Sequence, residues 1–200
     1  MTAAGEREAP RWRDTAVILA RGASRRMGFP KGLYRPDGGG PTLLERVAGL
    51  YRALGWPVAL VTHPAGERAY RPVAGDLVEA WVVTAPGGDT AASCLAAAAA
   101  LGTAGRRFWF HPVDLPAVRE ATVRRLLAVA TRDPGAVWVP RCGAARGHPV
   151  AVPGHLLAPL AGRWPPGRMA DLMIRHGWPL RFLPVDDPGC VRDVDRIPGA

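Results

Sequence analysis

The sequence lacks an apolar run long enough to cross a membrane. Its longest clean apolar stretch, residues 95–101, is far shorter than the roughly 20 residues that a membrane-spanning helix needs. Residues 1–14 are polar and charged, without the apolar core of an export signal. We therefore expect a soluble, cytoplasmic protein with no membrane partner.

Cysteine is scarce as well. Cys94, Cys142 and Cys190 lie far apart and form no CxxC pair, so neither a disulfide framework nor a zinc ribbon is indicated. The five histidines show no HExxH or other paired metal spacing, which favours structural or exposed positions for them. This composition fits a reducing compartment.

The chain has more basic than acidic residues, with a formal net charge of +9. Such a charge is compatible with nucleic acid or with a small anionic substrate. The arginines are scattered rather than gathered in one block, and no basic motif with interleaved aromatic residues is present. A solvated, arginine-rich surface is the simpler interpretation, and we expect no nucleic-acid partner.

Short apolar runs that alternate with helical segments predict an α/β fold. The runs of strand length are residues 15–20, 58–61, 81–83, 108–110, 137–139, 150–152 and 180–184. The helix-like segments are residues 42–54, 90–101, 121–131 and 168–176. Parallel strands need crossover connections, so we expect a mostly parallel central sheet with helices on both faces. Ligands bind such sheets beyond the carboxyl ends of the strands.

The length of the chain suits one hydrophobic core. Chains divide into several domains when a core grows beyond roughly 250 residues, and this chain has 200. We expect a disordered tail at residues 1–14 and one domain over residues 15–200. The clearest helix, residues 42–54, begins with Thr42 and Glu45 at the spacing of a capping box.

A basic loop with glycines follows the first predicted strand. Residues 21–31 contain Arg21, Arg25, Arg26 and Lys31, together with two glycines. Glycine lets the backbone approach a ligand, and the cations supply charge-assisted hydrogen bonds, as a polyphosphate requires. GxxxxGK and GxGxxG are both absent, which excludes a Walker loop and a dinucleotide fingerprint. On composition alone, a solvated surface loop remains the alternative.

An aspartate lies shortly after the strand at residues 108–110. Asp114 is expected at the edge of the sheet where ligands bind. One hard carboxylate suits Mg²⁺, which keeps several waters and takes its other ligands from substrate phosphates. From the residues alone, a turn or a helix N-cap explains this aspartate equally well.

The string LARGASRRMGFPK, residues 19–31, resembles the LAAGxSxRMGxxK opening of the molybdenum-cofactor nucleotidylyltransferases. This family contains the molybdopterin cytidylyl- and guanylyltransferases, in which the loop wraps the triphosphate. The resemblance implies that the nucleotide is bound by Leu19, Ala20, Arg21, Gly22, Ser24, Arg26, Gly28 and Lys31. It also implies catalytic roles for Arg26, Lys31 and Asp114.

Acidic motifs follow in the order that the family has. The HPVD string at residues 111–114 resembles the start of its DxP motif and implies that Asp114 binds the metal. Residues 185–195 resemble VDDPGxxxDID, which implies that Asp193 and Asp195 approach the same metal. Arg196 and Ile197 then replace the family's Thr-Pro, and the terminal helix usual in the family does not follow.

Two further motifs concern the substrates. Residues 146–150, RGHPV, match a turn of cytidylyl-type members and imply that Arg146, Gly147 and His148 bind the acceptor. Gly88 and Ser93 resemble the family's glycine-then-serine helix start and imply contacts with the nucleotide. A simple helix cap is the alternative for Ser93.

Taken together, the resemblance implies a Rossmann-like three-layer sandwich, the nucleotide-diphospho-sugar transferase fold. The implied activity is Mg²⁺-dependent transfer of CMP from CTP to a phosphorylated pterin-type acceptor, expected to be molybdopterin. The ARGAS string is also similar to the ARGGS-type loop of CMP-sugar synthetases, which use CTP. GTP as donor and a non-catalytic nucleotide or cofactor carrier are the alternatives. A molybdoenzyme or a cofactor-insertion protein is the expected macromolecular partner.

Overall fold

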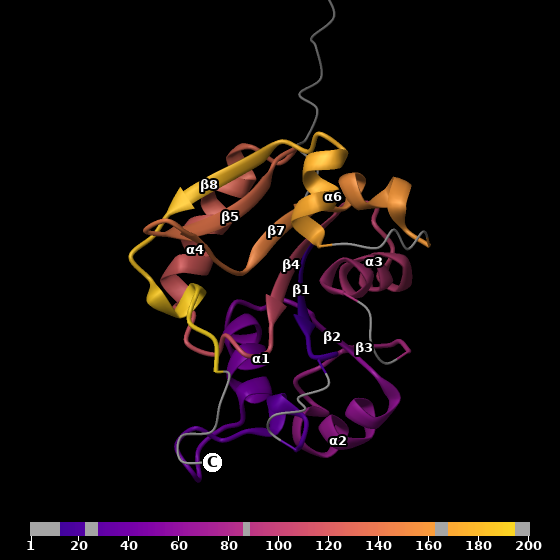
Figure 1. Ribbon diagram of the computed structural model, residues 1–200, viewed down its shortest axis with the longest axis vertical. Helices are drawn as coiled ribbons and strands as arrows, with labels where there is room; N and C mark the ends of the chain where they lie inside the picture. The colour runs from indigo at the N-terminus through magenta and orange to yellow at the C-terminus, as the bar shows by residue number, and fades with distance from the viewer. Residues whose placement is uncertain (1–12, 23–27, 86–88, 163–167, 195–200) are drawn as a thin grey trace, which may run out of the picture.

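A mixed sheet with helices on both faces forms the centre of the computed structural model (Figure 1). The structure describes residues 13–22, 28–85, 89–162 and 168–194. In these residues the strand order is β3-β2-β1-β4-β7-β5-β6, and β8 pairs with β5 outside this path. The predicted α/β class with a largely parallel sheet is confirmed.

Two sets of parallel strands are joined through one antiparallel strand. The first set comprises β1 (Arg13–Leu19), β2 (Val58–Thr62), β3 (Ala80–Val83) and β4 (Arg106–Pro112). The second set comprises β5 (Val137–Cys142) and β8 (Leu180–Pro184), with the short β6 (Ala145–Arg146) antiparallel to β5. Between the sets lies β7 (Val150–Pro153), antiparallel to both β4 and β5. Consequently β4 and β5 run in the same direction, and both sets have their carboxyl ends at one edge of the sheet (Figure 1).

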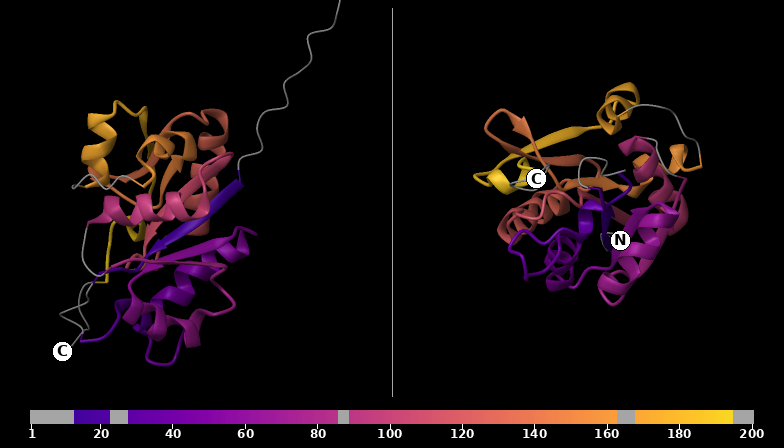
Figure 2. Two further views of the ribbon diagram at one scale, coloured as in Figure 1. Left: turned by 90° about the vertical axis from the view of Figure 1, so that its right-hand side faces the viewer. Right: turned by 60° about the horizontal axis from the view of Figure 1, so that its bottom comes forward.

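The helices bury two separate apolar faces of the sheet. One face is covered by α1 (Leu43–Ala53), α2 (Pro64–Ala74) and α4 (Glu120–Arg132). The other is covered by α3 (Thr90–Leu101), α5 (Gly154–Leu157) and α6 (Met169–Arg175) (Figure 2). Side chains alternate along a strand, so Ile18 of β1 packs on the first face and Val17 on the second. Among the described residues, the helices are too short or too polar to cross a membrane.

The helix α2 is not predicted by the sequence pattern. Gly66 and Pro72 interrupt its apolar periodicity. The helix nevertheless forms, because the backbone amides of its first turn have a hydrogen-bond partner or need none. The His63 side chain accepts a hydrogen bond from the Gly66 amide at 3.2 Å, and Pro64 occupies the first turn, where no amide partner is needed. The predicted capping box of Thr42 and Glu45 on α1 is present.

The strand β1 begins at Arg13 rather than at Thr15, which corrects the predicted limit of the N-terminal tail. The Arg13 amide donates to the Gly105 carbonyl at 2.9 Å. Asp14 also lies in the strand, and its carboxylate accepts a hydrogen bond from the Trp109 indole at 2.7 Å. Residues 13 and 14 are therefore part of the sheet, while residues 1–12 lie outside the described residues.

Candidate nucleotide and metal site

The predicted cation and the predicted carboxylate meet at the carboxyl edge of the sheet. Lys31 Nζ lies 3.1 Å from Asp114 Oδ2. They meet because β1 and β4 are parallel neighbours: Leu19 is in register with Pro112, and the Val113 amide donates to the Leu19 carbonyl at 3.1 Å. The exposed fractions of the two charged side chains are 16% and 26%. A ligand arriving from solvent can therefore reach both.

A buried tyrosine supports the segment that carries Lys31. Residues Lys31–Leu33 form a 3₁₀ turn, η1, and the Gly32 amide donates to the Tyr70 hydroxyl at 3.3 Å. Burial raises the pKa of Tyr70 to about 12, so its hydroxyl stays neutral. A Cβ on Gly32 would lie 2.8 Å from Tyr70 Cε1 and 3.1 Å from Val113 Cγ2. The unpredicted helix α2 thus fixes the position of the predicted lysine.

A buried histidine braces the turn that carries Asp114. The Nε2 atom of His111 lies 2.9 Å from the Leu115 carbonyl, and its Nδ1 atom lies 2.8 Å from the Tyr51 hydroxyl. A carbonyl can only accept, so Nε2 carries the hydrogen and Nδ1 accepts from Tyr51. Burial lowers the pKa of His111 to about 3, which keeps the ring neutral. The Nε2 bond therefore ties the start of this turn to its end, and the Nδ1 bond anchors it to α1.

The C-terminal acidic segment reaches the same turn. The Val194 amide donates to the Asp114 backbone carbonyl at 2.9 Å. Asp193, the preceding residue, is exposed, and Asp195 lies outside the described residues. Within the described ranges, no group of three or more His, Cys, Asp or Glu could hold a metal ion. One or two carboxylates nevertheless fit Mg²⁺, because this ion takes its remaining ligands from water and substrate phosphates.

The RGHPV turn packs against the C-terminal segment. The Gly147 amide donates to the Pro140 carbonyl at 2.8 Å, and the His148 amide donates to the Cys190 carbonyl at 2.9 Å. A Cβ on Gly147 would lie 2.6 Å from Cys190 Sγ, so this position needs glycine. Burial lowers the pKa of His148 to about 4, and the charge of Asp114 opposes this change. The C-terminal segment therefore contacts both the RGHPV turn, through the Cys190 carbonyl, and the Asp114 turn, through the Val194 amide.

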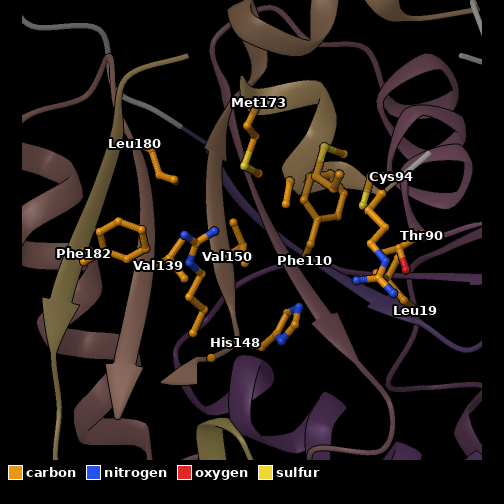
Figure 3. A pocket seen from close by; sticks show the side chains of 15 residues that line it. Leu19, Thr90, Cys94, Phe110, Val139, His148, Val150, Met173, Leu180 and Phe182 are labelled. Atoms are coloured by element: carbon orange, nitrogen blue, oxygen red, sulfur yellow. The ribbon is translucent and has the colours of Figure 1, made fainter. Parts of the chain in front are cut away.

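A cavity of about 280 Å³ opens beside the RGHPV turn. Its walls come from β4, β5, β7 and β8 of the sheet and from the helices α3 and α6, as Figure 3 shows. Arg146, Gly147 and His148 all contribute to its lining, together with Leu19 at the end of β1. The sequence contains no local signal for this cavity, because its walls come from separate elements.

The predicted nucleotide-binding segment begins at the end of β1. Leu19 is the last residue of the strand, and Ala20, Arg21 and Gly22 follow it at the carboxyl edge. The Ala20 amide donates to the β2 backbone at 2.9 Å, and its carbonyl lies 3.3 Å from the Thr62 hydroxyl. These bonds hold Ala20 against β2 at the carboxyl edge of the sheet.

Three residues that were predicted to bind the nucleotide lie outside the described residues, namely Ser24, Arg26 and Gly88. Their roles stay predictions. Gly28 is described and has a φ of 69°, a left-handed conformation that favours glycine. The predicted glycine of the loop is therefore required by its backbone geometry.

Ser93 does not cap α3. The N-cap is Asp89, whose side chain accepts from the Ala92 amide at 2.9 Å. Ser93 is buried in the first turn, and its hydroxyl donates to the Asp89 carbonyl at 3.4 Å. The capping role that was the alternative for Ser93 belongs to Asp89, and the nucleotide contact of Ser93 stays a prediction.

Asp187 is a buried carboxylate to which sequence reasoning assigned no role. It accepts hydrogen bonds from the Thr122 hydroxyl at 2.6 Å, the Arg119 amide at 2.9 Å and the Gly189 amide at 3.1 Å. The Arg119 amide lies at the start of α4, so Asp187 ties the segment after β8 to that helix. This anchoring positions the following residues, which include Asp193, beside the Asp114 turn.

These features are typical of α/β proteins that bind nucleoside triphosphates: the sheet, the basic segment after β1 and the carboxylate after β4. The sequence matches the family described as the MobA-like NTP transferase domain over residues 16–177, and the chain belongs to this family. It is thus a nucleotidyltransferase by family, and the predicted family is confirmed. No curated protein matches the chain.

Solved structures agree with this assignment. Rv0371c from Mycobacterium tuberculosis H37Rv is 30% identical, with a TM-score of 0.72 and coverage of 92% of this chain and 93% of that chain. Another structure of Rv0371c, described as a complex with manganese, is 25% identical, with a TM-score of 0.66 and coverage of 87% and 88%. Molybdopterin-guanine dinucleotide biosynthesis protein A from Archaeoglobus fulgidus is 15% identical, with a TM-score of 0.66 and coverage of 90% and 92%. This last likeness shows the fold alone.

Proposed function

We propose that the protein transfers CMP from CTP to a phosphorylated acceptor and releases pyrophosphate. The observation that carries this proposal is the 3.1 Å contact between Lys31 and Asp114 in a chain of the MobA-like family. The contact places a cation and a carboxylate side by side at the edge of the sheet where ligands bind. A triphosphate needs the cation, and its accompanying metal ion needs the carboxylate.

The acceptor requires no protein base. A phosphate monoester has a second pKa near 6, so it is already a dianion at neutral pH. One of its oxygens forms a bond to the α-phosphorus of the nucleotide, and the bond from this phosphorus to pyrophosphate breaks in line. The protein has to hold two anions together and to neutralise the growing charge on the leaving group.

The residues divide this work between them. Lys31 and Arg26 bind the triphosphate, with the backbone of the glycine loop around it. Asp114 would hold the divalent cation, assisted by Asp193 and Asp195, and Mg²⁺ bound there would neutralise charge on the phosphates. The manganese complex of Rv0371c supports the use of a divalent cation.

CTP is the proposed donor, because the RGHPV turn and the ARGAS string both resemble proteins that use CTP. GTP is the second candidate, and a non-catalytic carrier is the third. Molybdopterin is the acceptor that the resemblance suggests, with Arg146, Gly147 and His148 as its contacts. A cytoplasmic location and contact with a molybdoenzyme or a cofactor-insertion protein complete the proposal.

Pyrophosphate release tests the function. The protein is incubated with Mg²⁺, molybdopterin and each of the four NTPs in turn, and pyrophosphate is measured. We expect release that depends on both Mg²⁺ and acceptor and is fastest with CTP. Fastest release with GTP supports the guanylyltransferase, and nucleotide binding without release supports the carrier.

A further inference from the structure

The cavity beside the RGHPV turn has an apolar interior. The side chains of Phe110, Val139, Val150, Met173 and Phe182 face its space from β4, β5, β7, α6 and β8 (Figure 3). Its volume of about 280 Å³ is close to the lower limit of roughly 300 Å³ for small-molecule sites. An occupant of this interior is therefore about the size of one ring and needs few hydrogen bonds.

Polar side chains line the cavity at the ends of secondary-structure elements. Thr90 begins α3, Arg146 ends β6, and His148 precedes β7. Arg146 is exposed, and its guanidinium lies 5.3 Å from the centre of the Phe182 ring. Among the described lining residues, Arg146 and Arg168 are charged and none is acidic. The lining therefore complements a ligand with an apolar body and an anionic group.

We propose that this cavity binds an apolar, ring-sized body of the phosphorylated acceptor, with the phosphate held at the mouth by Arg146. The proposal rests on the proposed function for the identity of the cavity as the acceptor site. Leu19 lines the cavity, and its carbonyl accepts a hydrogen bond from the amide of Val113, the residue before Asp114, at 3.1 Å, so the cavity adjoins the place of phosphate chemistry. Arg146 is exposed, so its guanidinium can leave the Phe182 ring and bind a phosphate at the mouth of the cavity.

The same chemistry disfavours a polar heterocycle in the interior. A pterin ring carries several donors and acceptors that must keep hydrogen-bond partners when they leave water. The side chains of Phe110, Val139, Val150 and Phe182 provide none. The interior thus favours a phosphate ester of an aromatic or hydrocarbon alcohol over molybdopterin, the acceptor that the resemblance suggests. From the proposed function it takes only that the acceptor is phosphorylated.

Binding of small probes tests this without nucleotide or metal. Phenyl phosphate, inorganic phosphate, phenol and unsubstituted pterin are titrated into the full chain, and affinities are measured by ligand-observed NMR. We expect phenyl phosphate to bind at least 10-fold more tightly than inorganic phosphate or pterin. Equal affinity for phenyl phosphate and inorganic phosphate, or tighter binding of pterin, overturns the proposal.

A matched pair of variants on α6 locates the binding. Ala170 is exposed and lines the cavity, so Ala170→Phe fills the space from its rim. Ile174 is 71% exposed on the same helix and is not part of the lining, so Ile174→Phe is the control. We expect Ala170→Phe to weaken phenyl phosphate about 10-fold and to leave inorganic phosphate unchanged, with no effect of Ile174→Phe. An unchanged affinity of a folded Ala170→Phe variant contradicts the proposal.

Arg146→Ala provides a second test if Ala170→Phe does not fold. We expect Arg146→Ala to lower the affinity for phenyl phosphate and not that for phenol, because the variant removes the binding partner of the phosphate and leaves the apolar interior unchanged. Loss of both, or of neither, contradicts the assigned roles. Absence of pyrophosphate release with every NTP refutes the proposed function, whereas these binding results do not depend on turnover.

Discussion

Lys31 Nζ and Asp114 Oδ2 lie 3.1 Å apart although 83 positions separate the two residues. The contact exists because each residue follows one of two adjacent parallel strands, β1 and β4. Lys31 is also the only lysine in a chain with 26 basic residues.

Replacement of Asp114 by asparagine should reduce turnover about 100-fold or more, because a centrally placed charge is lost. The substitution keeps the shape of the side chain, and the carboxylate is partly exposed, so the melting temperature should change little. Steady-state kinetics at saturating CTP and a thermal melt measure the two effects. Unchanged turnover removes Asp114 from the mechanism.

Lys31→Ala should weaken CTP binding by about 1.5 to 3 kcal/mol, the usual range for a hydrogen bond to a charged group. Arg26→Ala should have a similar effect, since both cations are assigned to the triphosphate. Lys31→Arg keeps the charge and should lose less affinity, which makes it the control. If CTP affinity measured by calorimetry survives both alanine changes, the loop is only a surface turn.

Gly32→Ala should lower stability by about 1 to 3 kcal/mol, the cost of overpacking, and should weaken CTP binding. The added Cβ meets the buried Tyr70 ring at 2.8 Å, which displaces the turn that carries Lys31. Gly49→Ala is the matched control, because it lies inside α1 with no atom within 4 Å of the new Cβ. This control should raise stability by about 0.5 to 1 kcal/mol. Urea unfolding compares them, and equal effects of the two substitutions contradict the assigned role of Gly32.

Acid should destabilise the protein below pH 6.5. Burial lowers the pKa of His111 to about 3 and that of His148 to about 4, from 6.5 in an unfolded chain. Between the lowered pKa values and 6.5, the unfolded chain binds more protons than the folded protein. The stabilisation is therefore fully present above pH 6.5, and the free energy of unfolding falls as the pH drops toward 4. Each histidine contributes a slope of up to about 1.4 kcal/mol per pH unit. Urea unfolding of the wild type and of His111→Gln from pH 7 to pH 4.5 should show a shallower slope in the variant.

Arg21→Ala should weaken triphosphate binding without reversing the choice of base. The family has a small residue at this position, and an arginine there is better paired with phosphate than buried alone beside the base. The measurement is kcat/KM for CTP and for GTP in both proteins. A wild-type preference for GTP contradicts the assignment of CTP.

Sequence patterns located the described strands apart from the short β6, because buried strands are short, continuous apolar runs between turns, whereas β6 is exposed. They missed α2, because Gly66 and Pro72 hide its periodicity while the His63 cap and Pro64 sustain its start. The predicted N-terminal tail, residues 1–14, also included two residues of the sheet, because Arg13 and Asp14 are polar although they pair with β4. Local patterns do not contain these tertiary contacts.

For the candidate site, the motif positions predicted Lys31 and Asp114, and the two side chains are in contact. The supporting residues had no comparable signal. Tyr70, His111 and Asp187 act through buried hydrogen bonds to segments distant in sequence, except for the bond from His111 to Leu115. The apolar cavity was equally hidden, since its walls assemble only when the sheet is formed.

The most direct test of nucleotidyl transfer follows two labels on CTP in separate reactions with Mg²⁺ and the acceptor. Label in the α-phosphate should appear in the acceptor product, and label in the γ-phosphate should appear only in pyrophosphate. Both transfers should fall about 100-fold or more in Asp114→Asn. Label from the γ-phosphate in the acceptor, or in free inorganic phosphate without transfer of the α-label, would contradict the account.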